Sequence, residues 1–160
     1  MQVEEIRSLI EDAIPGAIIE IQENASPKKL VVSTSSLIAV CEFIHAHEKL
    51  YFDSLSCITG MDNGPEENQM EVIYGLYSIP HHISLSLQVN ISRKDPMVPS
   101  VTSIWKAANW HEREAYDLLG IHFEGHPDLR RILLPEDWTG HPLRKDYEEQ
   151  ENYHGVKVKY

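Results

Sequence analysis

One stretch of strict alternation restricts the fold of this chain more than any other feature. Along residues 81–91, hydrophobic and polar side chains take turns. The hydrophobic positions are Ile83, Leu85, Leu87, Val89 and Ile91. This period of two predicts a β-strand with one buried face and one wet face. A second strand is expected at 70–78, after a strong turn signal at 61–65, so the two predict an adjacent strand pair.

The remaining elements of the first hundred residues follow from the same kind of spacing. Hydrophobic residues three or four apart predict helices, and short alternating runs predict strands. The expected elements are a helix at 3–13, strands at 17–22 and 30–32 separated by a turn at 24–27, a helix from Ser35 or Ser36 to 49, and a strand at 51–59. The order α-β-β-α-β-β-β predicts an α+β fold, a two-layer sandwich with helices on one face of a mainly antiparallel or mixed sheet.

Composition argues against several classes of function. With 14 Lys and Arg against 25 Asp and Glu, the net charge of −11 disfavours binding to nucleic acid or to anionic lipid. No hydrophobic run approaches the roughly 18 residues that a membrane-spanning helix needs. The N-terminus lacks the hydrophobic segment of a secretory signal, so the cytoplasm is the expected compartment. Cys41 and Cys57, the two cysteines, cannot hold an iron–sulfur cluster and are expected to be buried thiols.

The common catalytic motifs are absent from the sequence. His111–Ala115 begins like a metalloprotease helix, but Ala115 replaces the second histidine. His45 and His47, like His81 and His82, are spaced so that they point to different sides. No nucleophile motif, dinucleotide fingerprint or phosphate-binding loop is present. A structural role is therefore expected for the nine histidines, with a free-standing enzyme built on a histidine-rich pocket as the alternative.

Two short helices are expected after the sheet, at 100–107 and 109–119. Asn109 and Glu112 have the spacing of a capping box, and Gly120 stands where a helix ends. Arg113 can pair with Asp117 one turn away. We expect the charged side of this second helix to face solvent.

A long segment without periodicity follows the second helix. Residues 121–147 hold three prolines and two glycines but also hydrophobic anchors, which favours an extended arm lying on another surface over a disordered tail. Two similar pieces, 125–131 and 140–145, each place a proline turn before a leucine and two cations. Such cations suit carboxylates or carbonyls on a partner, or else this chain's own acidic surface. Polar residues 148–160 are expected to fray. The chain thus divides into a sandwich domain, 1–120, and a partner-binding arm with its tail, 121–160, which we call the C-terminal arm.

Several motifs together carry a family resemblance. The run Glu112-Arg113-Glu114, then Asp117-Leu118-Leu119, His126, Arg130 and Ile132-Leu133, resembles the signature of the C subunit of NADH–quinone oxidoreductase. Flanking pieces at 95–102, 109–110 and 133–147 are similar to that family as well. Leu119 stands where the family pattern has an aromatic residue, and 59–62 is a looser match.

The resemblance implies a subunit of respiratory complex I or of a related machine. It implies a cofactor-free scaffold without catalytic residues, in a complex that passes electrons from NADH through FMN and iron–sulfur clusters on partner subunits to quinone, and that pumps protons. The implied neighbours are the quinone-pocket subunit (of the D type) and cluster-carrying subunits, and the implied place is the cytoplasmic side of the cell membrane. Plastoquinone-reducing, F420-dependent and hydrogenase-type complexes remain alternatives. The residues expected at the partner interface are Glu112, Arg113, Glu114, Asp117, His126, Arg130, Arg131, Trp138, His141, Arg144 and Lys145.

Overall fold

The centre of the protein is a five-stranded mixed sheet, seen in a computed structural model that describes residues 2–24 and 28–159. Its strand order is β1-β2-β5-β4-β3, and every neighbouring pair is antiparallel except β2 and β5, which are parallel. The strands are β1 (Ile18–Gln22), β2 (Lys29–Val32), β3 (Ser54–Asp62), β4 (Gln69–Ser78) and β5 (Ile83–Ser92). The predicted mixed sheet and the central strand pair are confirmed. Part of the turn expected at 24–27 lies outside the described residues.

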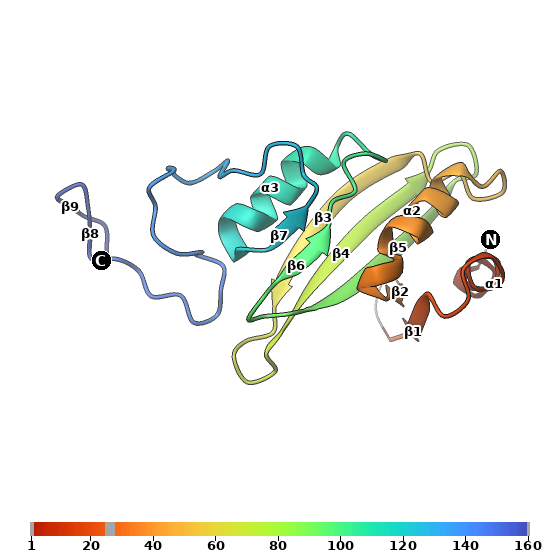
Figure 1. Ribbon diagram of the computed structural model, residues 1–160, viewed down its shortest axis with the longest axis horizontal. Coiled ribbons are helices and arrows are strands. Elements are labelled where there is room, and N and C mark those ends of the chain that lie inside the picture. The colour runs from red at the N-terminus through yellow and green to blue at the C-terminus, as the bar shows by residue number, and fades with distance from the viewer. Residues whose placement is uncertain (1, 25–27, 160) are drawn as a thin grey trace.

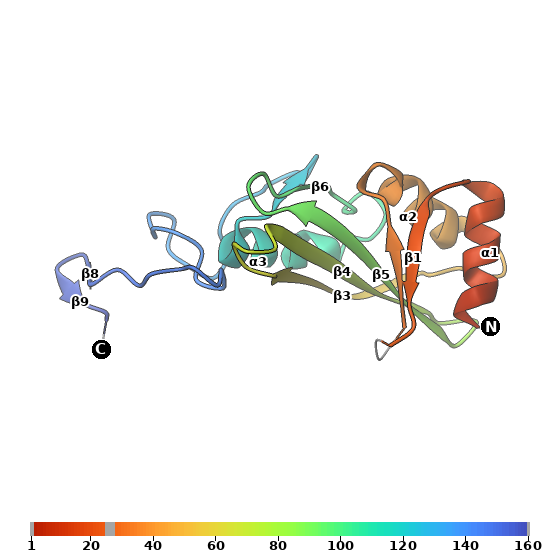
Figure 2. The same cartoon turned by 90° about the horizontal axis from the view of Figure 1, so that it is seen from below.

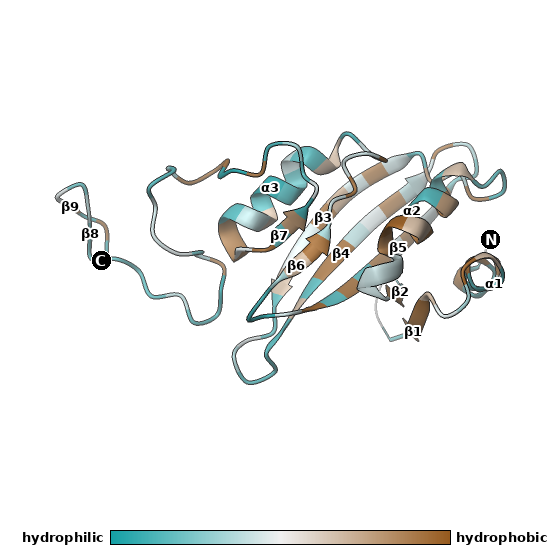
Figure 3. Cartoon of the chain, viewed as in Figure 1, coloured by the Kyte–Doolittle hydropathy of each residue, from teal (hydrophilic) through white to brown (hydrophobic). Residues whose placement is uncertain are grey.

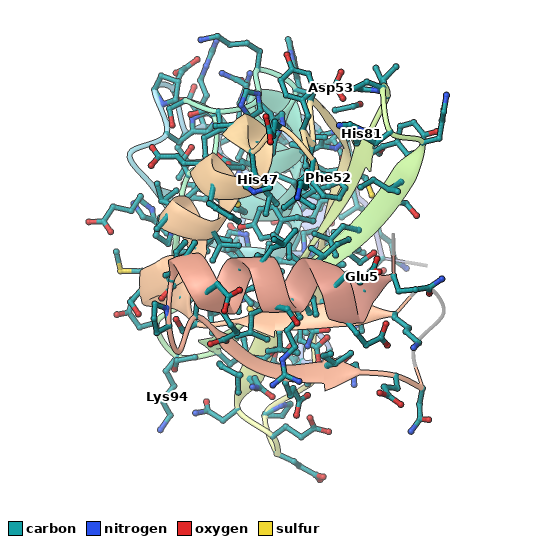
Figure 4. The ribbon with its side chains drawn as sticks, turned by 90° about the vertical axis from the view of Figure 1, so that its right-hand side faces the viewer. Glu5, His47, Phe52, Asp53, His81 and Lys94 are labelled. Atoms are coloured by element: carbon teal, nitrogen blue, oxygen red, sulfur yellow. The ribbon has the colours of Figure 1, made fainter. Side chains whose placement is uncertain are left out.

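Three helices supply the second layer. They are α1 (Val3–Ala13), α2 (Leu37–Ala46), which a short 3-10 turn at Thr34–Ser36 precedes, and α3 (Ala108–Leu119). Figure 1 shows α2 and α3 lying across the same face of the sheet, and Figure 4 shows α1 crossing the end of the molecule. Their buried side chains join one hydrophobic core with the inward residues of the sheet. The predicted two-layer α+β sandwich is therefore confirmed, and no described helix is long and apolar enough to cross a bilayer.

Beyond β5 the chain contains two small sheets that the sequence did not predict. β6 (Met97–Pro99) pairs in parallel with β7 (His122–Glu124), and β8 (Asn152–Tyr153) forms a hairpin with β9 (Val156–Lys157). The predicted division at residue 120 thus falls just before β7, which is still bonded to the body. The expectation of a frayed 148–160 is wrong for this hairpin. Figure 2 shows the C-terminal arm leaving the sandwich on the side opposite to α1, and Figure 3 shows it to be mostly hydrophilic.

The helix expected at 100–107 is not formed. The amides of Ile104 and Trp105 both donate to the carbonyl of Val101, which closes a single turn. The indole Nε1–H of Trp105 donates to the carbonyl of Phe52 at 2.9 Å and fixes this turn against the body. Tertiary contacts here override a weak local helical pattern.

Two expectations about buried faces need correction. The outer face of β5 is wet only at its ends, because Ser86 and Gln88 are buried although no described helix covers this face. Gln88 accepts from Lys29 on the neighbouring strand, which satisfies its amide oxygen. Cys41 is buried as expected, but Cys57 is exposed. Cys57 lies on β3, which is an edge strand of the sheet. A bulge between Leu55 and Cys57 changes which side chains of this strand face outward.

Candidate interaction site on α3 and the C-terminal arm

The two similar pieces of the arm clamp the two ends of α3. Each begins with a glycine of positive φ, 82° at Gly125 and 84° at Gly140, which turns the chain back toward the helix. His126 Nε2 lies 3.1 Å from the carbonyl oxygen of Asn109, in the first turn of α3. His141 Nδ1 lies 2.9 Å from the carbonyl oxygen of Asp117, in the last turn. The short repeat seen in the sequence is therefore a pair of clamps on one helix.

Asp117 is the organising residue of the arm. Its carboxylate is fully buried, and Oδ2 accepts from three successive amides, those of Ile132, Leu133 and Leu134, at 3.0, 2.7 and 2.9 Å. Oδ1 accepts from Arg131 Nη1 at 2.8 Å. Burial alone would raise the pKa of Asp117, but these four donors hold it below its usual range. The carboxylate stays ionised and folds the arm around itself.

Two largely buried arginines complete this arrangement through backbone carbonyls. Arg131 Nη2 donates to the carbonyls of Trp138 and Gly140, both at 2.9 Å. Arg113 does not pair with Asp117, as the sequence suggested, but donates to the carbonyls of Arg130 and Arg131 at 3.1 and 3.0 Å. The expectation that this side of α3 faces solvent is therefore wrong for Arg113 and Asp117, because the arm covers both.

Hydrogen bonds from the arm also cap the C-terminal end of α3. The last carbonyls of a helix have no partner within it. Here the Leu143 amide donates to the carbonyl of Leu118 at 3.0 Å, and Arg144 Nε donates to that of Leu119 at 2.7 Å. Gly120 adopts the left-handed conformation expected of a helix end, with φ of 75°. The C-terminal half of α3 and residues 131–144 thus form one hydrogen-bonded unit.

A second anchor ties the arm to the end of the sheet. Asp62 accepts from Arg93 Nε at 2.7 Å and from the Lys145 amide at 2.9 Å, and Arg93 also pairs with Asp146 of the arm. Burial alone would raise the pKa of Asp62, yet Arg93 and the amides of Lys145 and Gly64 lower it to about 2. The sequence prediction missed this anchor. The Asp62-Asn63-Gly64 turn was a visible signal, since Asp62 accepts from the Gly64 amide, but nothing in the sequence pairs Asp62 with Arg93.

Glu112 occupies the other end of α3 in a different environment. Its predicted capping box is not formed, because the helix begins at Ala108 without a side-chain cap. Instead Oε2 accepts from the Ser100 hydroxyl at 2.7 Å and Oε1 from the Val101 amide at 2.8 Å. The carboxyl is fully buried. Burial raises its pKa to about 7, although both hydrogen bonds oppose this shift. Ser100 and Val101 were not predicted as its partners.

The predicted interface residues divide into internal and outward-facing sets. Trp138 donates to the Tyr147 hydroxyl, and Lys145 Nζ to the carbonyl of Asn63. Glu114 is exposed, and the Arg130 side chain is 71% exposed, with only Asp128 as an ion-pair partner among the described residues. Exposed hydrophobic side chains accompany them: Trp110, Leu133 and Leu143. Between α3 and β3 lies a cleft of about 130 Å³ that Leu143 helps to line.

The histidines that the structure describes do not gather into a site. His81 Nε2 lies 2.8 Å from the Glu48 carbonyl oxygen, and Figure 4 shows it apart from His47. His154 contacts Asp137, near the C-terminus. Within residues 2–24 and 28–159 no group of three or more His, Cys, Asp or Glu side chains could hold a metal ion.

Comparison with known proteins gives a consistent set of relatives. A family model described as the 30 Kd subunit of respiratory-chain NADH dehydrogenase matches residues 30–153. The NADH-quinone oxidoreductase C subunit of Chloroherpeton thalassium is 44% identical over 154 residues, which cover 95% of this chain but 63% of that protein. The C subunit of Chlorobium phaeobacteroides is 47% identical over 133 residues, covering 81% of this chain and 78% of that one.

Two solved structures resemble the fold. A trypsin-resistant fragment (1-134) of Nqo5 is 30% identical with a TM-score of 0.62, and the match covers 78% of this chain and 98% of the fragment. A chain of a membrane-bound sulfane sulfur reductase, an archaeal respiratory membrane complex, has a TM-score of 0.75 at 23% identity, over 92% of this chain and 86% of that one. The second likeness concerns the fold alone. The family match and the relatives agree with the resemblance seen at Glu112–Leu133, and the chain belongs to the family of the 30 Kd subunit of respiratory-chain NADH dehydrogenase, also named the C subunit of NADH-quinone oxidoreductase.

Proposed function

We propose that this chain is a non-catalytic, cofactor-free structural subunit in the peripheral arm of a proton-pumping NADH:quinone oxidoreductase. The observation that carries the proposal is the C-terminal arm, whose backbone is bound by largely buried side chains of the chain itself. Asp117, Arg131 and Arg113 bind the backbone of the arm through hydrogen bonds within the chain. A segment that is held in one conformation loses less entropy when it binds, so these contacts support a scaffold role.

The partner-facing part of this site is the outward surface of the arm and of α3. Arg130 is a cation at this surface, and Trp110, Leu133 and Leu143 are 63%, 63% and 58% exposed. Exposed aromatic and leucine side chains beside an arginine are the composition of a protein–protein contact. Arg113, Asp117, Arg131 and Arg144 support this surface from within.

We place the electron carriers on other subunits. Two cysteines, one buried and one exposed, cannot ligate an iron–sulfur cluster. FMN and the clusters would therefore belong to partner chains, with the quinone-pocket subunit and a cluster-carrying subunit as the neighbours of this one. The names of the relatives support an assembly that acts on NADH and quinone. We place the assembly at the cytoplasmic side of the cell membrane, which this chain would reach through its partners.

The two alternatives are weighed differently by the structure. A similar scaffold role in a plastoquinone-reducing, F420-dependent or hydrogenase-type complex fits the fold equally well, because the electron input lies on other chains. A free-standing enzyme with a histidine-rich pocket has less support, since the histidines contact separate parts of the body and of the arm.

Purification from the native host tests the proposal. We expect an affinity-tagged copy of this chain to be recovered from detergent-solubilised membranes with flavin- and cluster-carrying subunits, identified by mass spectrometry. The same preparation should oxidise NADH with a quinone acceptor. Recovery as a free monomer in the soluble fraction would contradict a scaffold role, whereas a different electron-input subunit would select the related complexes.

A charge reversal tests the outward surface itself. Arg130→Glu should reduce the amount of assembled complex on native gels about tenfold, because the reversal places a carboxylate in the contact surface. Arg7→Glu is the matched control, since Arg7 is exposed on α1 at the other end of the molecule. Complex that does assemble should keep its turnover per flavin. Normal assembly of Arg130→Glu would remove this surface from the interface.

A further inference from the structure

A chain of hydroxyl groups leads from buried Glu112 toward the surface. The Ser100 hydroxyl lies 2.7 Å from Glu112 Oε2 and 2.8 Å from the Thr102 hydroxyl. Glu112 is fully buried and Ser100 is 8% exposed, while Thr102 is half-buried. The three groups therefore form a continuous hydrogen-bonded path from Glu112 on α3 to a residue that is only half-buried.

The described residues around Glu112 supply no cation. On its own helix, Arg113 turns to the arm and Glu114 to solvent. From the sheet, the buried Tyr74 hydroxyl has no partner among the described atoms, and its pKa is raised by burial first and then by the nearby Cys41 and Glu112. From α2, burial raises the pKa of the Cys41 thiol, so Cys41 also stays neutral. An ionised Glu112 is thus an uncompensated charge, which is costly in a protein core.

We propose that Glu112 is a proton-binding site, which exchanges one proton with solvent through the hydroxyls of Ser100 and Thr102. In the ionised state Thr102 donates to Ser100, and Ser100 donates to the carboxylate. On proton uptake, the Thr102 oxygen accepts a proton from solvent, and each hydroxyl passes its own proton to the next oxygen. The carboxyl then donates to Ser100, Ser100 donates to Thr102, and the site changes from one negative charge to none.

Both states of this path have their hydrogen bonds satisfied. The Thr102 amide also donates to the Ser100 oxygen, at 3.2 Å, so Ser100 has a second donor while it serves the carboxylate. The Val101 amide holds Oε1 in either state. Burial raises the pKa of Glu112 to about 7, which lets both states be populated near neutral pH. Proton uptake would remove an uncompensated charge beneath α3.

Two hydroxyl deletions with opposite expected effects test the site. Infrared difference spectra of the full chain, recorded as pH is varied, should show the C=O band of a protonated carboxyl, and Glu112→Gln should abolish this band. Ser100→Ala removes a donor to the carboxylate and should raise the midpoint of the band by about one pH unit. Thr102→Val removes the acceptor that Ser100 needs when Glu112 is protonated, and should lower the midpoint by a similar amount.

The opposite directions separate a relay from simple burial. A buried carboxyl without a hydroxyl path would respond to Ser100→Ala but not to Thr102→Val. Loss of the band in Glu114→Gln, an unchanged midpoint in Thr102→Val, or a band that survives Glu112→Gln would each overturn the proposal. Because the three hydroxyl and carboxyl variants are compared in one measurement, a variant that fails to fold leaves the other two to decide.

Discussion

The two ends of α3 each bury a carboxylate, and they stabilise it in opposite ways. Glu112 receives one hydroxyl and one amide, with no cation beside it in the described part of the chain. Asp117, five residues later, receives three amides and the guanidinium of Arg131. Both are fully buried, yet the pKa of Glu112 is raised and that of Asp117 is lowered. Burial raises the pKa of both carboxyls; the four donors to Asp117 outweigh it, whereas the two donors to Glu112 do not.

The difference assigns the two ends different tasks. Asp117 has four donors, so its carboxylate is ionised near neutral pH and can bind the arm backbone continuously. A carboxyl near its midpoint can change state while the helix stays in place. The N-terminal end of α3 is thus suited to respond to protons, and the C-terminal end is suited to hold the arm. The predictions below probe this contrast.

The largest effect is expected from Asp117→Asn. The amide keeps the size of the side chain but leaves Arg131 buried without a counter-charge and turns an NH₂ group toward backbone donors. Loss of one partner of a buried ion pair destabilises by about 4 kcal/mol. Urea unfolding of the isolated chain should show this loss, and trypsin should cut faster after Arg130 and Arg131. Unchanged cleavage would mean that the arm does not depend on Asp117.

The next effect is the pH dependence contributed by Glu112. Its pKa is raised in the folded chain, from 4.5 to about 7, so the folded state binds the extra proton. Stability should therefore fall as pH rises through this window, by about 3 kcal/mol, and level off above it. Glu112→Gln should remove this slope in urea unfolding, whereas Glu114→Gln, on the same helix but exposed, should keep it. If stability depended on pH equally in both variants, Glu112 would not be the group that causes this dependence.

At acid pH the stability should change in the opposite direction, and this change tests the anchor between the arm and the sheet. The pKa of Asp62 is lowered from 3.8 to about 2, so the ion pair with Arg93 stabilises the chain above this window. Stability should be lost as pH falls through it, by about 2 kcal/mol. Asp62→Asn should flatten the acid limb of the stability curve and leave the Glu112 slope in place. If Asp62→Asn also removed the pH dependence of stability that Glu112 contributes, the sheet anchor and Glu112 would be coupled.

Local signals in the sequence predicted the body well and the site only in part. The alternation at 83–91 predicted β5, and the glycine at position 120 predicted the end of α3. Both signals depend only on residues that are close in the sequence. The pairing of Asp117 with Arg131, and of Glu112 with Ser100, could not be predicted. Charges on a helix normally face solvent, but here residues 131–134 bond to Asp117 and residues 100–101 bond to Glu112. The repeated Gly-His-Pro pieces were recognised, but the helix they clamp was not.

A smaller effect is expected between α3 and the strand beneath it. Gly60 lies where an added Cβ would be 2.5 Å from Leu119 Cδ1 and 3.0 Å from Ile121 Cδ1. Gly60→Val should therefore push away the C-terminal end of α3 and cost about 2 kcal/mol of stability. Arm cleavage by trypsin should rise, while the infrared midpoint of Glu112 stays in place. Gly75→Val is the matched control, because its nearest neighbour is the sulfur of exposed Cys57, which can move aside.

The smallest effect is expected one residue away from one of the largest. Arg130 and Arg131 are adjacent cations, but the side chain of Arg130 is 71% exposed and that of Arg131 is 15% exposed. Arg130 pairs with exposed Asp128, and such surface pairs contribute about 0.5 kcal/mol or less. Arg130→Ala should therefore leave urea unfolding of the isolated chain nearly unchanged, whereas Arg131→Ala should loosen the arm as Asp117→Asn does. If the two alanine variants were equally unstable, Arg130 would belong to the internal set, and the outward surface would rest on its hydrophobic side chains alone.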